Sequence, residues 1–194
     1  MKQMLLAVVC TFAMTLPAFA QPPVQGAGAP ANPFSNALKA SYDTVSGYLA
    51  RSAEKMPEAD YSFKPTPEVR SFGEIIGHVA NAEFSYCSRA KGEKNPNQGN
   101  DFEKKTAKAD LVKAINDSNA YCSAVYGSMT DAMAVEPIAA PAPPSGSQAR
   151  PAQPPPMRVR VLLGNVTHDQ EHYGNLVTYL RLKGLVPPSS EPRK

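Results

Sequence analysis

Apolar residues recur three and four positions apart in four separate stretches of this chain, the spacing that places them on one face of an α-helix. The four stretches cover residues 35–55, 72–90, 110–133 and 157–183. In the first, Tyr42, Val45 and Leu49 follow this spacing. No stretch of useful length alternates apolar and polar residues as a strand would. The pattern therefore predicts an all-α fold, most economically a four-helix bundle with long connections.

Local signals mark several helix ends. Ser71 followed by Glu74 has the form of a capping box, which predicts a helix start. Asp110 can cap the third helix, and Gly184 with the prolines after it ends the fourth. Residues 137–156 contain eight prolines among twenty positions, so they cannot continue a helix. We interpret them as a long Pro/Ala-rich loop between the third and fourth helices and assign it no function.

The N-terminus has the features of a secretory signal peptide. Lys2 precedes an apolar run over residues 4–16, and residues 18–20 form an A-x-A cleavage site. We therefore expect cleavage after Ala20 and a secreted or periplasmic mature protein. The expected organisation is a signal peptide, a disordered Pro/Gly/Ala-rich leader, the helical bundle and a short tail, over residues 1–20, 21–34, 35–188 and 189–194.

Charge and hydropathy exclude two classes of partner. The chain has 20 basic and 17 acidic side chains, and removal of Lys2 with the signal leaves 19 and 17. With neither a basic stripe nor interleaved aromatic residues, the protein is not expected to bind nucleic acid. No second apolar segment is long enough to cross a bilayer, so no membrane span is expected in the mature chain.

Two cysteines, Cys87 and Cys122, remain after the expected cleavage. They could form a disulfide in an oxidising compartment, but two cysteines do not define a disulfide framework. Cys122 shares helical spacing with Leu111, Ile115 and Val125. The favoured interpretation is therefore a buried free thiol, with the disulfide as the alternative.

The three histidines of the chain indicate a metal site. His168 and His172 lie four residues apart in a helical stretch, so their imidazoles share one face, one turn apart. His78 lies on the apolar side of the second helix. Three neutral imidazoles can bind one divalent ion and leave a position open for water or a substrate, since no fourth protein ligand is evident. The weaker alternative is a set of hydrogen-bonded core histidines without metal.

The polar residues near these histidines have different expected roles. Glu74 could orient His78, but its capping role explains it without chemistry. Asn165 and Asn175 fall on the histidine face and could fix the imidazole tautomers. Asp169 and Glu171 point away from that face, so both are expected to face solvent.

Several segments resemble the DinB-like (DinB/YfiT-type) family. The matching segments are residues 63–68, 70–83, 168–181 and 184–188. The last-helix segment has the family's two histidines four apart, followed by Gly174 and an amide, Asn175. The resemblance covers residues 35–188, in register across all four helices. The chain departs from the family pattern in carrying an export signal and in having Tyr173 and Asn175 where many relatives have a basic residue and Gln.

The resemblance implies a four-helix bundle in which His78, His168 and His172 bind one divalent ion (Zn, Ni, Fe or Mn), and frequent homodimers. Two functions are compatible with it. The first is an exported metal-dependent hydrolase or transferase acting on a small molecule. The alternative is a non-catalytic metal-binding or stress-related binding module, because no unambiguous general base accompanies the histidines.

Overall fold

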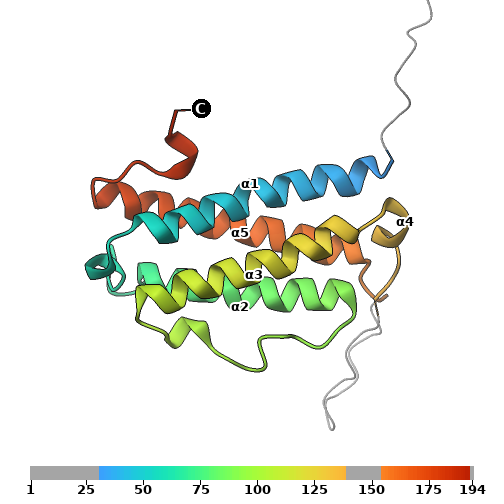
Figure 1. Cartoon of the computed structure of the whole chain (residues 1–194), viewed down its shortest axis with the longest axis horizontal. Coiled ribbons are helices and arrows are strands. Elements are labelled where there is room, and N and C mark those ends of the chain that lie inside the picture. The colour runs from blue at the N-terminus through green and yellow to red at the C-terminus, as the bar shows by residue number, and fades with distance from the viewer. Residues whose placement is uncertain (1–30, 139–153, 193–194) are drawn as a thin grey trace, which may run out of the picture.

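Four long α-helices dominate residues 31–138 and 154–192, the parts of the chain that the computed structural model describes (Figure 1). They are α1 (Pro33–Lys55), α2 (Phe72–Lys91), α3 (Lys108–Ser128) and α5 (Arg158–Leu182). The shorter elements are η1 (Glu58–Asp60), η2 (Phe102–Lys104), α4 (Asp131–Ala134) and η3 (Pro188–Ser190). The described residues form no strand, only an isolated bridge between Pro137 and Met157. The all-α prediction is confirmed.

The four long helices form a bundle in which α2 packs against α3 and α5, and α1 packs against the same two helices. Helices α2 and α3 run in one direction, while α1 and α5 run in the other (Figure 1). Because α2 and α3 are parallel, the chain between them must return along the length of the bundle. That return segment contains η2, which lies against α2.

The helix ends agree with the sequence pattern at most positions. The capping box of Ser71 and Glu74 is present at the start of α2. The third helix differs, because Ala107 occupies its N-cap position and Asp110 lies within the first turn. It also stops at Ser128, and the Thr130 side chain caps a separate short helix, α4, by accepting a hydrogen bond from the Met133 amide.

The core has two apolar clusters along the bundle axis. One contains Leu49, Phe72 and Leu180, and the other contains Tyr42 and Leu162. Buried polar side chains accompany them, and the fully buried members include Glu83, Ser118, Asn165 and Asp169. The bundle therefore contains a buried polar group in addition to its apolar core.

The favoured interpretation of the cysteines was wrong. Cys87 on α2 and Cys122 on α3 form a disulfide, with their Cα atoms 5.4 Å apart. Helical spacing correctly predicted that Cys122 is buried, but burial on one helix says nothing about the partner that faces it. The parallel arrangement of α2 and α3, which the pattern did not determine, brings the two cysteines together.

Some sequence predictions concern residues outside the described part. The signal peptide (1–20), most of the leader (21–34), most of the Pro/Ala-rich loop (137–156) and the last two residues of the tail (189–194) lie there. Within the described ranges, none of the helices combines the length and apolar character that a membrane span requires.

Candidate metal centre

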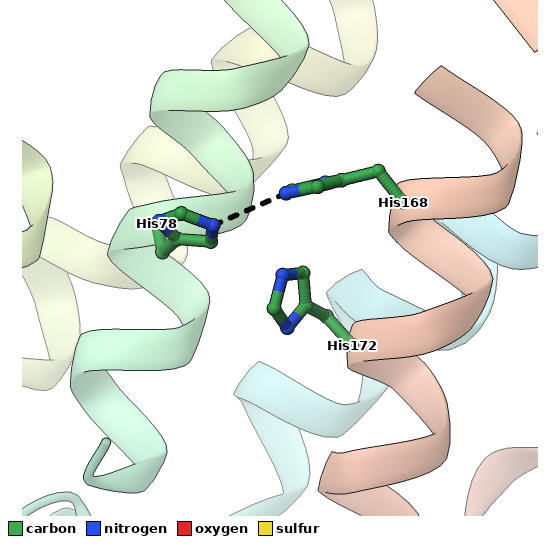
Figure 2. Close-up of side chains that lie close together, drawn as sticks. All are labelled: His78, His168 and His172. Carbon is green, nitrogen blue, oxygen red and sulfur yellow. Dashed lines mark hydrogen bonds between the residues drawn. The ribbon is translucent and has the colours of Figure 1, made fainter. Parts of the chain in front are cut away.

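The three histidines predicted as metal ligands meet between α2 and α5. His78 projects from α2 toward His168 and His172, which lie one turn apart on α5 (Figure 2). The ring centroids are 5.1 Å apart for His78 and His168, 4.8 Å for His78 and His172, and 4.4 Å for His168 and His172. The packing of α2 beside α5 thus brings residues that are ninety positions apart in sequence into one cluster.

A single ion fits the positions of the ligand nitrogens. The Nε2 atoms of His78 and His168 are 3.1 Å apart, and one nitrogen from each of the three rings lies within 4.8 Å of the others. Two nitrogens bound tetrahedrally to one zinc ion at ~2.0–2.1 Å would lie roughly 3.4 Å apart. The three histidines could therefore hold one divalent ion. Imidazole ligands alone do not select which ion.

The surroundings keep all three imidazoles neutral. Burial, reinforced by proximity to His168 and His78, lowers the pKa of His172 to about 4. Burial also lowers the pKa values of His168 and His78, although the hydrogen bond to Glu103 opposes this effect at His78. At neutral pH each ring therefore keeps the lone pair that a metal ion requires.

Glu103 and Arg70 belong to the site, and the sequence analysis missed both. The Glu103 carboxylate lies 3.1 Å from Nδ1 of His78 through Oε2 and accepts a 2.6 Å hydrogen bond from Nε of Arg70 through Oε1. Burial acts to raise the pKa of Glu103, but Arg70 and His78 outweigh it and leave the pKa lowered. An ionised Glu103 favours a proton on Nδ1 of His78, which leaves Nε2 free to face the other histidines.

Gly77, next to His78, allows η2 to approach α2 closely enough for this contact. A Cβ atom at Gly77 would lie 2.7 Å from the Glu103 amide nitrogen, and closer still to the carbonyl of Phe102. The Asn81 side chain holds the same segment by accepting a hydrogen bond from the Phe102 amide. A side chain at position 77 would thus have to displace the backbone that carries Glu103.

We expect Gly77→Ala to displace η2 and separate Glu103 from His78. The overpacking should lower the free energy of unfolding by about 1–3 kcal/mol. Thermal unfolding measures this loss. Gly174→Ala on α5 is the matched control, because nothing lies within 4 Å of a Cβ there. That variant should gain up to about 1 kcal/mol from helix propensity. Equal stabilisation by both substitutions would contradict the close approach at Gly77.

The two asparagines predicted to orient the histidines differ in outcome. Nδ2 of Asn175 lies 3.5 Å from Nδ1 of His172, so this asparagine is placed as expected. Asn165 contacts no histidine and instead donates hydrogen bonds to the Tyr126 hydroxyl and to Asp169. Asn165 therefore belongs to the buried polar group of the core and is not a partner of the histidines.

The expectation that Asp169 faces solvent was wrong. Asp169 is fully buried, whereas Glu171 is exposed as predicted. Helix α5 packs against both α1 and α2, so its buried arc is wider than the histidine face alone. A position 100° around the helix from His168 still lies inside that arc.

A cavity of about 700 Å³ opens beside the histidines. Residues 64–70, the segment between η1 and α2, form one wall. Glu103, His172, Asn175 and Tyr179 are among the other lining residues. Because His172 lines this cavity, a small molecule in it could reach an ion bound by the histidines.

Comparison with known proteins identifies relatives of this chain. The family model described as DinB superfamily matches residues 41–176. A DinB-like protein from Bacillus subtilis has a similar structure, with a TM-score of 0.61 and 20% identity, covering 81% of this chain and all of that one. A conserved protein from Enterococcus faecalis gives a TM-score of 0.59 and 15% identity, covering 77% of this chain and 96% of that one. No curated protein matched the sequence. At these identities the two structures show a shared fold.

Proposed function

Since this chain belongs to the DinB superfamily, we propose that it is an exported protein that binds one divalent metal ion through His78, His168 and His172. We propose further that it acts on a small molecule as a metal-dependent hydrolase or group transferase. The observation that carries the proposal is the convergence of three neutral imidazoles beside a cavity of about 700 Å³. Three ligands leave room in the coordination sphere for water or substrate.

The proposed export is supported by two separate features. The N-terminal twenty residues have the charged start, apolar run and cleavage site of a signal peptide. The Cys87–Cys122 disulfide fits an oxidising compartment, because thiols in the cytoplasm are kept reduced. The two features are independent and favour the same location.

The roles of the individual residues follow from their positions. A divalent ion in such a site lowers the pKa of bound water or activates another nucleophile. His78, His168 and His172 would hold the ion, and Glu103 keeps the Nδ1 proton on His78. The wall formed by residues 64–70 would confine the small molecule next to His172. A cavity of this size suits a small molecule better than a polymer.

One observation favours the alternative, a non-catalytic metal-binding or stress-related binding module. Glu103 lies within hydrogen-bond distance of a histidine, yet both its carboxylate oxygens are already engaged, one by His78 and one by Arg70. A general base must be directed at the reacting proton, whereas this carboxylate is held toward His78 and Arg70. In the alternative, the ion would clamp α2 to α5, and its removal would lower the melting temperature without abolishing any reaction.

The test is the metal content of the purified protein, produced by export and without a histidine tag. We expect near-stoichiometric divalent metal in the unaltered protein and at least a tenfold loss in His168→Ala, because two imidazoles alone bind weakly. Gln170→Ala, an exposed substitution in the same helical turn, is the matched control and should retain the metal. Equal metal in the unaltered protein and in His168→Ala, or none in either after reconstitution, would contradict the proposal.

The two candidate functions are separated by a second measurement on the metal-loaded protein. A screen of ester, amide and thiol-transfer substrates should give turnover that disappears in His168→Ala if the protein is an enzyme. Retained metal, a chelation-dependent fall in melting temperature and no turnover would instead support the binding module.

A further inference from the structure

Asp169 and His168 face each other with atoms that lack hydrogen-bond partners. Asp169 is fully buried, and its Oδ1 atom has no hydrogen-bond partner within the described residues. Nδ1 of His168 is likewise buried and without such a partner in that part of the chain. The two atoms lie 3.7 Å apart, slightly beyond hydrogen-bond length. Buried polar atoms without partners are costly, so their proximity calls for an explanation.

The opposite oxygen of Asp169 is fixed from within the core. Asn165 donates a 3.1 Å hydrogen bond to Oδ2 of Asp169, and its amide also donates to the Tyr126 hydroxyl. That hydroxyl in turn donates to the carbonyl of Leu162. These hydrogen bonds orient the Asn165 amide, and Glu83 also lies against the Asp169 carboxyl group from within the core. Together they hold Asp169 in place with its Oδ1 atom 3.7 Å from Nδ1 of His168.

From these contacts we infer that Asp169 is a positioning residue for the metal centre, whose carboxylate accepts the Nδ1 proton of His168 and directs Nε2 at the ion. The inference rests on the proposed function. A neutral imidazole that binds metal through Nε2 must carry its proton on Nδ1, and that proton needs an acceptor. Asp169 is the acceptor placed to receive it.

The inference gives two of the three histidines a carboxyl group as outer partner. Glu103 lies against Nδ1 of His78, and Asp169 takes the same role for His168 from the core side. The Asn175 side chain presents its NH₂ nitrogen, a donor, to Nδ1 of His172 and cannot accept a ring proton there. Metal-binding histidines usually donate their second ring proton to such a group, and its loss typically weakens metal binding.

The competing explanation is that Asp169 serves only the buried polar group of the core. Glu83 supplies the matched control for this explanation, because it is also fully buried and its Oε1 and Oε2 accept hydrogen bonds from Tyr42 and Ser118. No described contact joins Glu83 to a histidine. Glu83 does lie against Asp169, so Glu83→Gln alters the buried acid pair while leaving the Asp169–His168 contact in place. Asp169→Asn alters the same pair and also the contact with His168.

Asparagine at position 169 cannot replace aspartate in both contacts. Its single carbonyl oxygen can accept from Asn165 or from His168, and its NH₂ group would then face the other donor. Asp169→Asn thus keeps the size of the side chain while forcing two donors against each other. This conflict makes the substitution specific for the proposed role.

The experiment is a calorimetric titration of the metal-free protein with Zn²⁺, using the unaltered protein, Asp169→Asn and Glu83→Gln. We expect Asp169→Asn to weaken Zn²⁺ binding by about 10–100-fold, and Glu83→Gln to leave the affinity close to that of the unaltered protein. Undiminished affinity in Asp169→Asn, or an equal loss in both variants, would overturn the inference. Absence of Zn²⁺ binding by the unaltered protein would overturn the proposed function, and this inference with it.

A measurement on the unaltered protein alone keeps the inference testable if Asp169→Asn does not fold. Nitrogen-15 NMR of the Zn²⁺-loaded protein distinguishes the two imidazole tautomers. We expect His168 to bind through Nε2 and to show an Nδ1 proton that exchanges slowly with water, because its acceptor is buried. An Nδ1 proton that exchanges freely, or zinc bound through Nδ1, would overturn the inference.

Discussion

Breaking the Cys87–Cys122 disulfide is expected to lower the free energy of unfolding by about 4 kcal/mol, from the chain-entropy relation for a link between residues 35 positions apart. For a domain of this size such a loss lowers the melting temperature by roughly 10 °C. The link should matter because it joins two parallel helices, which a long return segment separates in sequence. While the disulfide is intact, the unfolded chain has less conformational entropy, and this makes unfolding less favourable.

The measurement compares thermal unfolding of the oxidised protein with the same protein after reduction under mild denaturation. Reduction leaves every side chain in place, so the comparison isolates the covalent link from any packing change. A double variant, Cys87→Ala with Cys122→Ala, should unfold at or below the reduced protein's temperature. Two titratable thiols in the natively purified protein, with no effect of reductant on unfolding, would contradict the disulfide.

The disulfide also shows where sequence reasoning stops. Helical spacing predicted four long helices and their apolar faces, because a buried face leaves a periodic record in the sequence. It could not predict that α2 and α3 run parallel, since direction is set by the path of the connection between them. The partner of Cys87 depends on that direction, and so the pairing was missed.

The candidate metal centre, too, could be predicted from the sequence only in part. His168 and His172 could be recognised because two residues four apart on one helix share a face whatever the rest of the fold does. The hydrogen-bond partners of the histidines outside the cluster could not be recognised. Glu103 reaches His78 from a short 3-10 helix whose place against α2 depends on Gly77, and a glycine inside a helix does not by itself reveal what approaches it. His78 could be grouped with the pair because it is the one other histidine of the chain and lies on the apolar side of its helix, and the family resemblance implied the same three ligands.

Asp169 illustrates a different limit. A helical wheel assigns one inward direction, whereas α5 faces two neighbouring helices and buries a broader arc. A fully buried carboxyl group on that arc runs against the usual preference of acidic residues for the surface. Such a contradiction is informative, because a protein retains a costly buried charge where its removal would disturb a site.

Glu83→Gln is expected to make the metal-free protein more stable at pH 8 by about 1–3 kcal/mol, the range typical of a buried polar or charged group, because the hydrogen bonds from Tyr42 and Ser118 only partly offset the cost of burying an ionisable carboxyl group. Burial, and then the negative charge of Asp169, raise the pKa of Glu83 well above its ordinary value. In the unfolded chain a glutamate loses its proton near pH ~4.3. Above that pH the folded state binds more protons than the unfolded state, so the stability of the unaltered protein falls as pH rises.

The test is the unfolding free energy of both proteins between pH 5 and pH 8. Because glutamine does not titrate, the difference in unfolding free energy between Glu83→Gln and the unaltered protein should be small at pH 5 and grow as the pH rises. His172, with its pKa lowered to about 4, contributes the opposite slope between its folded and unfolded pKa values. Both proteins share this pH dependence from His172, so it cancels in the difference between their unfolding free energies. Glu171→Gln, an exposed change on α5, should give a curve parallel to that of the unaltered protein. If Glu83→Gln also gave a parallel curve, Glu83 would not titrate differently in the folded core, and its burial beside Asp169 would cost the protein nothing.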